Sequence, residues 1–204
     1  MSQHRHKAMH RRTYTPPDAS SLPDLALSAN EAAAIMGVHW TRPRKMADQG
    51  LLMCKALRPA WSPNSERSTR IYSLHDCESD YRNYLALRQA RDSSLRRPRT
   101  NLDDREEMLR RLATVEPILF KDACGTGEAS EILRVTPCLI LRYAEEGVLR
   151  GRKPMDNLRG TEDSTARWWL LSTSSVVARR DHVIAEEVAD KKRGLRKFID
   201  PLDN

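Results

Sequence analysis

The stretch LSANEAAAIMGVHWTRPRKMADQGLL, which runs from Leu27 to Leu52, has a second copy in this chain of 204 residues. The second copy, GTGEASEILRVTPCLILRYAEEGVL, runs from Gly125 to Leu149. At a fixed offset of 97 positions, the identical pairs are Glu31 and Glu128, Ala32 and Ala129, Ile35 and Ile132, Val38 and Val135, Ala47 and Ala144, Gly50 and Gly147, and Leu52 and Leu149. Such a repeat indicates a small domain that has been duplicated.

The same offset also matches Arg70 with Arg167, which predicts that the irregular stretch after each glycine has one length in both copies. The further pairs on this register are Ile71 with Trp168, Tyr72 with Trp169, Leu74 with Leu171, and Asp76 with Thr173.

Each copy is expected to begin with a short helix. In the first copy, Ser28 followed by Glu31 predicts a capping box at the start of this helix, and Gly37 suits a tight turn after it. Apolar residues at i, i+3 and i+4 indicate the buried face, namely Ala32, Ile35 and Met36.

A second helix is expected from about residue 40 to 49, with Met46 and Ala47 turned inward and Gly50 as its C-terminal stop. Pro43 lies inside this range. Because proline lacks the backbone donor of a helix interior, the helix is expected to begin late or to bend.

The second copy repeats this pattern with Val135, Ile140 and Tyr143 turned inward and with Gly147 as the stop. Arg134 replaces the glycine of the turn. Two short helices joined by a tight turn form a helix-turn-helix, whose second helix can enter the major groove of DNA.

The segment LLMCKALRPAWSPNSERSTRIYSL follows Gly50, and its two apolar runs flank a cluster of Pro, Asn and Ser. This pattern predicts a β-hairpin, or wing, and a further helix follows over residues 75–90. The corresponding final helix of the second copy is expected to begin at Ser175.

The succession EAAxxxGV, about ten residues, GLL, a basic hairpin and RIYSLHD resembles the winged helix-turn-helix of MerR-type regulators and phage excisionases. In that group an arginine, an aromatic residue and an aspartate lead out of the wing, and here they match Arg70, Tyr72 and Asp76. The resemblance covers about 50 residues per copy and about half the chain. It implies a mainly α protein with small β-hairpin wings, built as two tandem winged helix-turn-helix domains that bind double-stranded DNA.

The chain is basic, with a formal net charge of +7, and this favours an anionic partner such as nucleic acid. No apolar run approaches the roughly 18 residues of a membrane span. We therefore expect a cytoplasmic, nucleoid-associated protein with no membrane contact. The expected organisation is a basic arm over 1–20, winged domains over 21–92 and 123–190, a helical linker over 93–122, and a basic tail over 191–204.

Two of these segments have open interpretations. The basic arm either lies along DNA or is a solvated tail. The linker is too apolar for a free tether, so its helix within 102–120 either packs between the domains or provides a self-association surface, which the C-terminal helix could also provide.

The candidate DNA-binding residues lie in the second helix and the wing of each copy. In the first copy they are His39, Trp40, Thr41, Arg42, Arg44, Lys45, Arg58, Arg67 and Arg70. In the second copy they are Thr136, Arg142, Arg150, Arg152, Lys153, Arg159 and Arg167.

The first copy is the stronger candidate, because residues 39–70 carry a net charge of +5 and residues 136–167 only +1. Arg44 has the donor geometry to contact guanine O6 and N7, Lys45 is expected on a phosphate, and Arg142 suits a phosphate in the second copy. The apolar residues of the second helix in the second copy leave two alternatives, simple packing or a protein contact.

No phosphate-binding loop, metal-spaced cluster or nucleophile motif is present in the sequence, so neither an enzyme nor a cofactor is expected. Cys54, Cys77, Cys124 and Cys138 form no CxxC pair and are expected to be reduced and mostly buried.

The function that follows is sequence-specific binding of double-stranded DNA as a transcriptional regulator, with two domains reading two half-sites in one chain. One alternative is an excision factor or segregation-site binder that lines up along DNA. A further alternative is a protein-interaction adaptor in which only one domain reads DNA.

Overall fold

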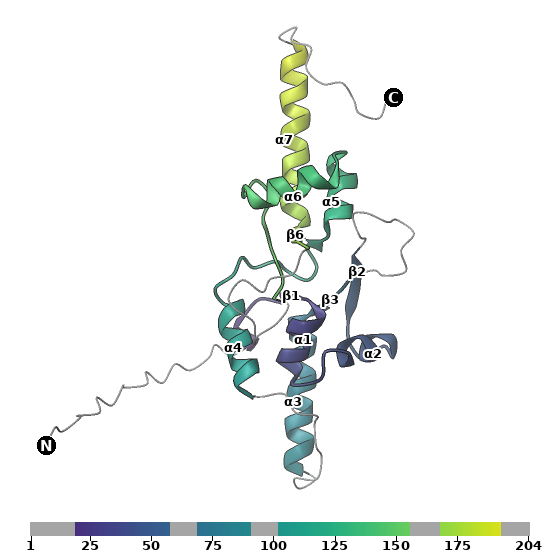
Figure 1. Ribbon diagram of the computed structural model, residues 1–204, viewed down its shortest axis with the longest axis vertical. Helices are drawn as coiled ribbons and strands as arrows, with labels where there is room; N and C mark the ends of the chain where they lie inside the picture. The colour runs from purple at the N-terminus through teal and green to yellow at the C-terminus, as the bar shows by residue number, and fades with distance from the viewer. Residues whose placement is uncertain (1–18, 58–68, 91–101, 156–167, 193–204) are drawn as a thin grey trace, which may run out of the picture.

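The computed structural model describes residues 19–57, 69–90, 102–155 and 168–192 (Figure 1). Over this part of the chain it is mainly helical, with seven α-helices, a short 3-10 helix and two three-stranded antiparallel sheets. The first half contains η1 (Ala19–Ser21), β1 (Ala26–Leu27), α1 (Ala29–Met36), α2 (Arg42–Asp48), β2 (Cys54–Leu57), β3 (Thr69–Ser73) and α3 (Leu74–Ala90). The second half follows α4 (Leu102–Leu112) and contains β4 (Ala123–Cys124), α5 (Thr126–Leu133), α6 (Pro137–Glu145), β5 (Gly151–Arg152), β6 (Leu170–Ser172) and α7 (Thr173–Lys192).

The two halves have the same element order and the same sheet topology. The strand order is β1-β3-β2 in one sheet and β4-β6-β5 in the other, so the first strand of each half pairs with its last strand. None of the described helices combines the length and the apolar composition that a bilayer crossing requires.

The hairpins differ in length, so the expectation of an unbroken offset is wrong. Cys54 pairs with Tyr72, while Gly151, its partner in the repeat, pairs with Leu171. The offset is thus 97 before the hairpin and 99 after it, and the second hairpin is two residues longer. Backbone pairing determines the register here, and the apparent matches of Arg70 with Arg167 and of Leu74 with Leu171 in the sequence are coincidental.

The corrected register places Leu171 rather than Trp169 at the position of Tyr72, and Ser175 rather than Thr173 at the position of Asp76. Hydrogen bonds confirm the second match. The Asp76 carboxylate accepts from the backbone N–H of Met53 at 3.0 Å, and the Ser175 hydroxyl accepts from that of Arg150 at 2.9 Å. Both contacts tie the start of the third helix to the residue before the hairpin.

The first helix of each half begins and ends as its sequence predicts. At α1 the Ser28 hydroxyl accepts from the N–H of Glu31, whose carboxylate accepts from the N–H of Ser28, so the capping box is confirmed. Gly37 ends α1 with φ 65°. Arg134 ends α5 in the same left-handed conformation with φ 55°, although it carries a side chain.

The second helix of each half begins at or near a proline. Pro43 lies in the first turn of α2, where backbone N–H groups have no acceptor within the helix, so proline costs no hydrogen bond there. The helix accordingly begins at Arg42 rather than near residue 40. In the second half, Pro137 is the first residue of α6.

The third helices, α3 and α7, begin on equivalent caps that the sequence did not reveal. The Ser73 hydroxyl accepts from the N–H of Asp76 and donates to Asp24 at 2.7 Å. The Ser172 hydroxyl does the same between Ser175 and Asp122. The two helices point away from each other at opposite ends of the molecule (Figure 1).

The linker helix α4 packs against α1 within the same chain. Its side chains Met108, Leu109 and Leu112 are buried in the core that α1 also lines. Arg105 donates to the carbonyl of Ile35 at 3.1 Å and forms an ion pair with Glu78. The segment therefore packs within the core of the first half rather than only between the halves, and self-association stays a prediction.

The two halves are joined along their sheets. One hydrophobic cluster takes residues from both sheets, including Ala26, Ile71, Ala123 and Leu170. The segment before β4 lies along the start of β1, where Ala26 donates to the carbonyl of Ile118 at 2.9 Å. The two sheets therefore share a core and hold the halves together.

Candidate nucleic-acid interface

The most exposed set of candidate residues surrounds the N-terminal end of α2. Pro43 and Met46, three positions apart, turn inward and are buried. This spacing directs the intervening side chains outward, and Arg42, Arg44 and Lys45 are exposed.

The residues before α2 are ordered by a local contact. The Thr41 hydroxyl lies 3.0 Å from Nδ1 of His39, which also accepts from the N–H of Thr41 at 3.4 Å. His39 and Trp40 are exposed, Trp40 to 61%, and their ring centroids are 5.6 Å apart. This segment presents an imidazole, an indole and a hydroxyl beside the cations of α2.

Two further apolar side chains are exposed near α2, and neither is among the residues expected from the sequence to bind DNA. Leu51 is 65% exposed and Met53 57% exposed, while Leu52 between them is buried. They lie in the bend between Gly50 and β2, and no local pattern in the sequence separates them from the buried Leu52.

Strand β3 of the first half contributes Arg70, which is already paired. Its Nη1 lies 2.5 Å from the Asp48 carboxylate at the end of α2. This hydrogen bond raises the pKa of Arg70 against the opposing effect of burial. The pair fixes β3 against α2, so Arg70 has a structural contact of its own.

The α6 face of the second half is less charged. Thr136 and Cys138 are exposed, and Leu139 and Leu141 are half-buried. The cation of this face is Arg142, whose guanidinium is 2.7 Å from Glu146 one turn later, and this contact raises its pKa.

Two other candidate cations of the second half also have partners. Arg150 lies 2.6 Å from Glu116. Lys153 lies 3.9 Å from Glu145 and 5.1 Å from the centre of the Trp169 ring.

The expectation that Arg152 lies on the DNA-facing surface is wrong. Its side chain is 4% exposed, and its Nη1 lies 2.6 Å from the fully buried carboxylate of Glu31 in the first half. Its Nη2 donates to the carbonyl of Ala26 at 2.7 Å. A charge at this depth requires a buried partner, and Glu31 supplies it.

Four further candidates, Arg58, Arg67, Arg159 and Arg167, lie outside the described residues.

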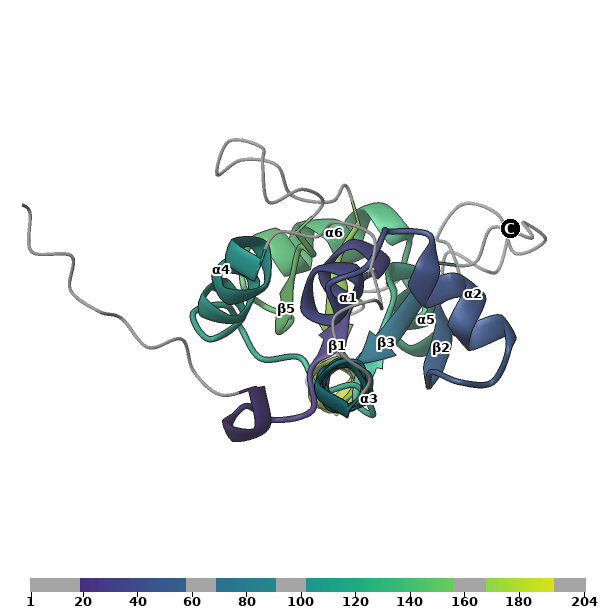
Figure 2. The same ribbon diagram turned by 90° about the horizontal axis from the view of Figure 1, so that it is seen from below.

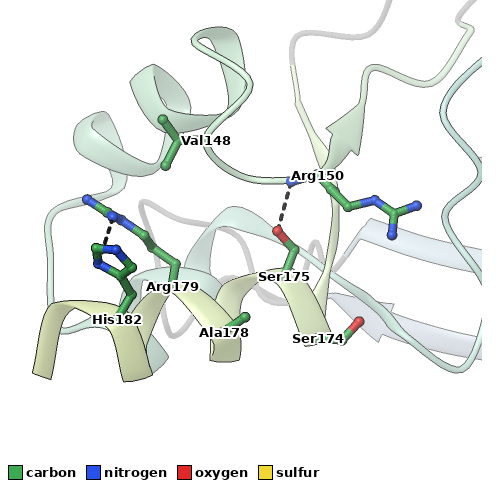
Figure 3. Close-up of a pocket in the computed structure, with 7 residues that line it drawn as sticks. All are labelled: Val148, Arg150, Ser174, Ser175, Ala178, Arg179 and His182. Atoms are coloured by element: carbon green, nitrogen blue, oxygen red, sulfur yellow. Dashed lines mark hydrogen bonds between the residues drawn. The ribbon is translucent and has the colours of Figure 1, made fainter. Parts of the chain in front are cut away.

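A shallow hollow lies between the turn after α6 and the first half of α7 (Figure 3). Ser174, Ser175, Arg179 and His182 line it, and Arg179 lies with its Nη1 3.5 Å from Nδ1 of His182. In Figure 3 the guanidinium of Arg150 points away from this pair.

The equivalent positions of the first half have a different charge. On the corrected register Asp76 replaces Ser175, Asp80 replaces Arg179 and Asn83 replaces His182. The same surface is thus acidic in one half and basic in the other.

Two of the four cysteines are buried in the part of the chain that the structure describes. Burial raises the pKa of the Cys124 thiol to about 11 and that of the Cys77 thiol well above its usual value, so neither is a thiolate nucleophile at neutral pH. Cys54 and Cys138 are exposed, so only half of the cysteines are buried as expected. Among the described residues, no three His, Cys, Asp or Glu side chains gather into a possible metal site.

No protein-family model matches this chain, and no curated protein matches it.

Proposed function

We propose that this protein binds double-stranded DNA in a sequence-specific manner and acts as a transcriptional regulator. In this proposal each half is a winged helix-turn-helix domain, and α2 is the principal reading helix. The observation that carries the proposal is the exposed end of α2, where Arg42, Arg44 and Lys45 point outward. None of these three is ion-paired within the part of the chain that the structure describes, whereas Arg70, Arg142 and Arg150 are.

Unpaired cations along one exposed helix suit a polyanion. Lys and Arg release counterions when they bind phosphates. Arg44 supplies the parallel donors that guanine O6 and N7 accept in the major groove. Trp40 and Thr41 add apolar and hydroxyl contacts, and Lys45 is assigned to a phosphate.

The shape of the first half supports insertion of α2. Its ends are held by Pro43 in the first turn and by the Asp48 to Arg70 pair at the last turn. A reading helix that is fixed at both ends is presented to DNA without a further ordering cost.

The test is a genome-wide pull-down of DNA bound to the full chain, beside an Arg44→Ala variant and an Arg142→Ala control. We expect sharp peaks that share one motif, that disappear with Arg44→Ala and that persist with Arg142→Ala. Peaks that are absent, or that persist unchanged without Arg44, would overturn the proposal.

A further inference from the structure

The contacts between the two halves are reciprocal. Lys55 and Arg152 are equivalent residues of the repeat, as are Ala26 and Ala123, in each case 97 positions apart. Nζ of Lys55 donates to the carbonyl of Ala123 at 2.5 Å, and Nη2 of Arg152 donates to the carbonyl of Ala26 at 2.7 Å. When residue i of one unit contacts residue j of the other and the converse also holds, a twofold rotation relates the units.

The directions of the helices agree with a twofold relation. A head-to-tail arrangement of two copies would leave α3 and α7 pointing the same way, whereas they point in opposite directions (Figure 1). The two halves of one chain are therefore arranged as the subunits of a symmetric dimer would be.

Buried contacts fix this arrangement. The Glu31 carboxylate accepts from Arg152 at 2.6 Å and from the N–H of Met155 at 3.0 Å, and Met155 enters the core of the first half. Removing one partner from a buried ion pair is strongly unfavourable, so rotation of one half against the other is opposed.

The two candidate reading helices lie on one side of the molecule. Viewed along the long axis, α2 and α6 are both on the same side of α3 (Figure 2), and along that axis α2 is in the lower half and α6 in the upper half (Figure 1). A duplex also has twofold axes perpendicular to its length, so two reading helices related in this way meet half-sites in inverted orientation.

The faces of the two helices are not alike. Thr41, just before α2, corresponds to Cys138 of α6. Arg44 and Lys45 of α2 correspond to Leu141 and Arg142 of α6. An arginine face selects guanine, while apolar side chains in the major groove contact the methyl group of thymine.

We propose that one chain binds a duplex with two unlike half-sites in inverted orientation, a guanine-containing half read by α2 and a thymine-rich half contacted by α6. This inference rests on the proposed function. It adds the relative orientation of the two half-sites, their base composition and the number of chains per duplex.

The experiment starts with selection of the full chain on a random-sequence duplex library. The two selected halves are then rebuilt as inverted and direct pairs and as single halves, and the dissociation constant and the number of chains per duplex are measured. We expect one chain per inverted duplex, and at least about a tenfold loss of affinity for the direct pair, because simultaneous contact by linked modules is lost when geometry forbids it.

Two matched variants separate the halves. Thr41→Asp and Cys138→Asp place a carboxylate at equivalent positions near the start of α2 and α6, of which Thr41 is half-buried and Cys138 exposed. We expect Thr41→Asp to remove selection of the guanine half, and Cys138→Asp to reduce binding of the inverted duplex to that of the single guanine half.

Selection of direct repeats, binding of two chains per duplex, or unchanged binding by Cys138→Asp would overturn this inference. In those cases a motif that depends on Arg44 leaves the proposed function intact. If no motif is selected, or if Arg44→Ala leaves the selected motif unchanged, both this inference and the proposed function are overturned.

Discussion

The ends of α2 and α6 occupy equivalent places in the two halves and differ in charge. Arg42 and Arg44 of α2 correspond to Leu139 and Leu141 of α6. Lys45 and Arg142 are both cations, and of these two only Arg142 has an ion pair among the described residues. The halves also differ at the interface between them, where Lys55 donates to a carbonyl but Arg152 neutralises a buried carboxylate. Two copies of one backbone can thus differ in role, because the first half has exposed cations on α2 and the second half has a buried cation, Arg152.

The largest expected effect comes from changing the interface between the two halves. Arg152→Ala leaves the buried Glu31 carboxylate without its cation, and we expect a loss of about 3–5 kcal/mol in the free energy of unfolding. Lys55→Ala, at the equivalent position, removes one hydrogen bond to a carbonyl and should cost about 1 kcal/mol. Chemical denaturation measures both, with Lys153→Ala as the neighbouring control. Equal losses in the free energy of unfolding for the two variants would contradict the different roles of Arg152 and Lys55 at this interface.

The next effect concerns the cap of α7. The Asp122 carboxylate is partly buried, which opposes its ionisation, but the hydroxyls of Ser172 and Ser174 and the N–H of Ser174 hold its pKa below the usual value. We expect Asp122→Asn to cost about 1–2 kcal/mol at pH 7, since hydrogen bonds to a charged group are lost.

The pH dependence of that cost has a fixed sign. Because the folded pKa of Asp122 is lowered, its contribution is present above the ordinary aspartate pKa of about 3.9 and is lost as the pH falls through the folded value. Denaturation of the wild type and of Asp122→Asn should therefore converge below about pH 4. A difference in stability that stays constant across this range would exclude the ionised carboxylate as the cause.

A smaller effect concerns the turns after the first helices. Gly37 and Arg134 both adopt positive φ, a conformation that costs a residue with a side chain about 1 kcal/mol or more. We expect Gly37→Ala to destabilise the protein by about 1 kcal/mol and Arg134→Gly to stabilise it by a similar amount. A methyl group on Gly37 would lie 3.6 Å from the Tyr81 ring, an ordinary contact, so backbone strain is the expected cause. Thermal unfolding measures both variants, and their changes in stability must have opposite signs.

The smallest effect is on the salt dependence of the proposed DNA binding. Lys45→Ala should lower the slope of log affinity against log salt by about 0.9, the value for one phosphate contact. Arg142→Ala should lower it by less than half as much, because Glu146 already lies against its guanidinium. Titration of both variants at several salt concentrations checks this, and equal slopes would show that the pairing in α6 has no consequence for DNA.

The sequence predicted local features well. The Ser28 and Glu31 capping box is confirmed, and the helices expected over residues 75–90 and near Met108 are present. Each of these depends on residues within a few positions of one another, where propensity and hydrophobic spacing are informative.

The features that the sequence did not predict depend on distant residues. The two-residue lengthening of the second hairpin is visible only in the pairing of Gly151 with Leu171. The contact of Arg152 with Glu31 joins residues of opposite halves, and nothing in the local sequence separates this arginine from its less buried neighbours Arg150 and Lys153. A basic residue in a hairpin is ordinarily solvated, and only the fold shows which one is buried.

The pairing of Glu31 with Arg152 has a consequence for the nascent chain. The two residues are separated by 121 positions. At a synthesis rate of about 5–20 residues per second, about 6–24 seconds pass between the incorporation of one and that of the other. During that interval the Glu31 carboxylate at the start of α1 lacks its cation, so the first half completes its fold only when the second half has left the ribosome.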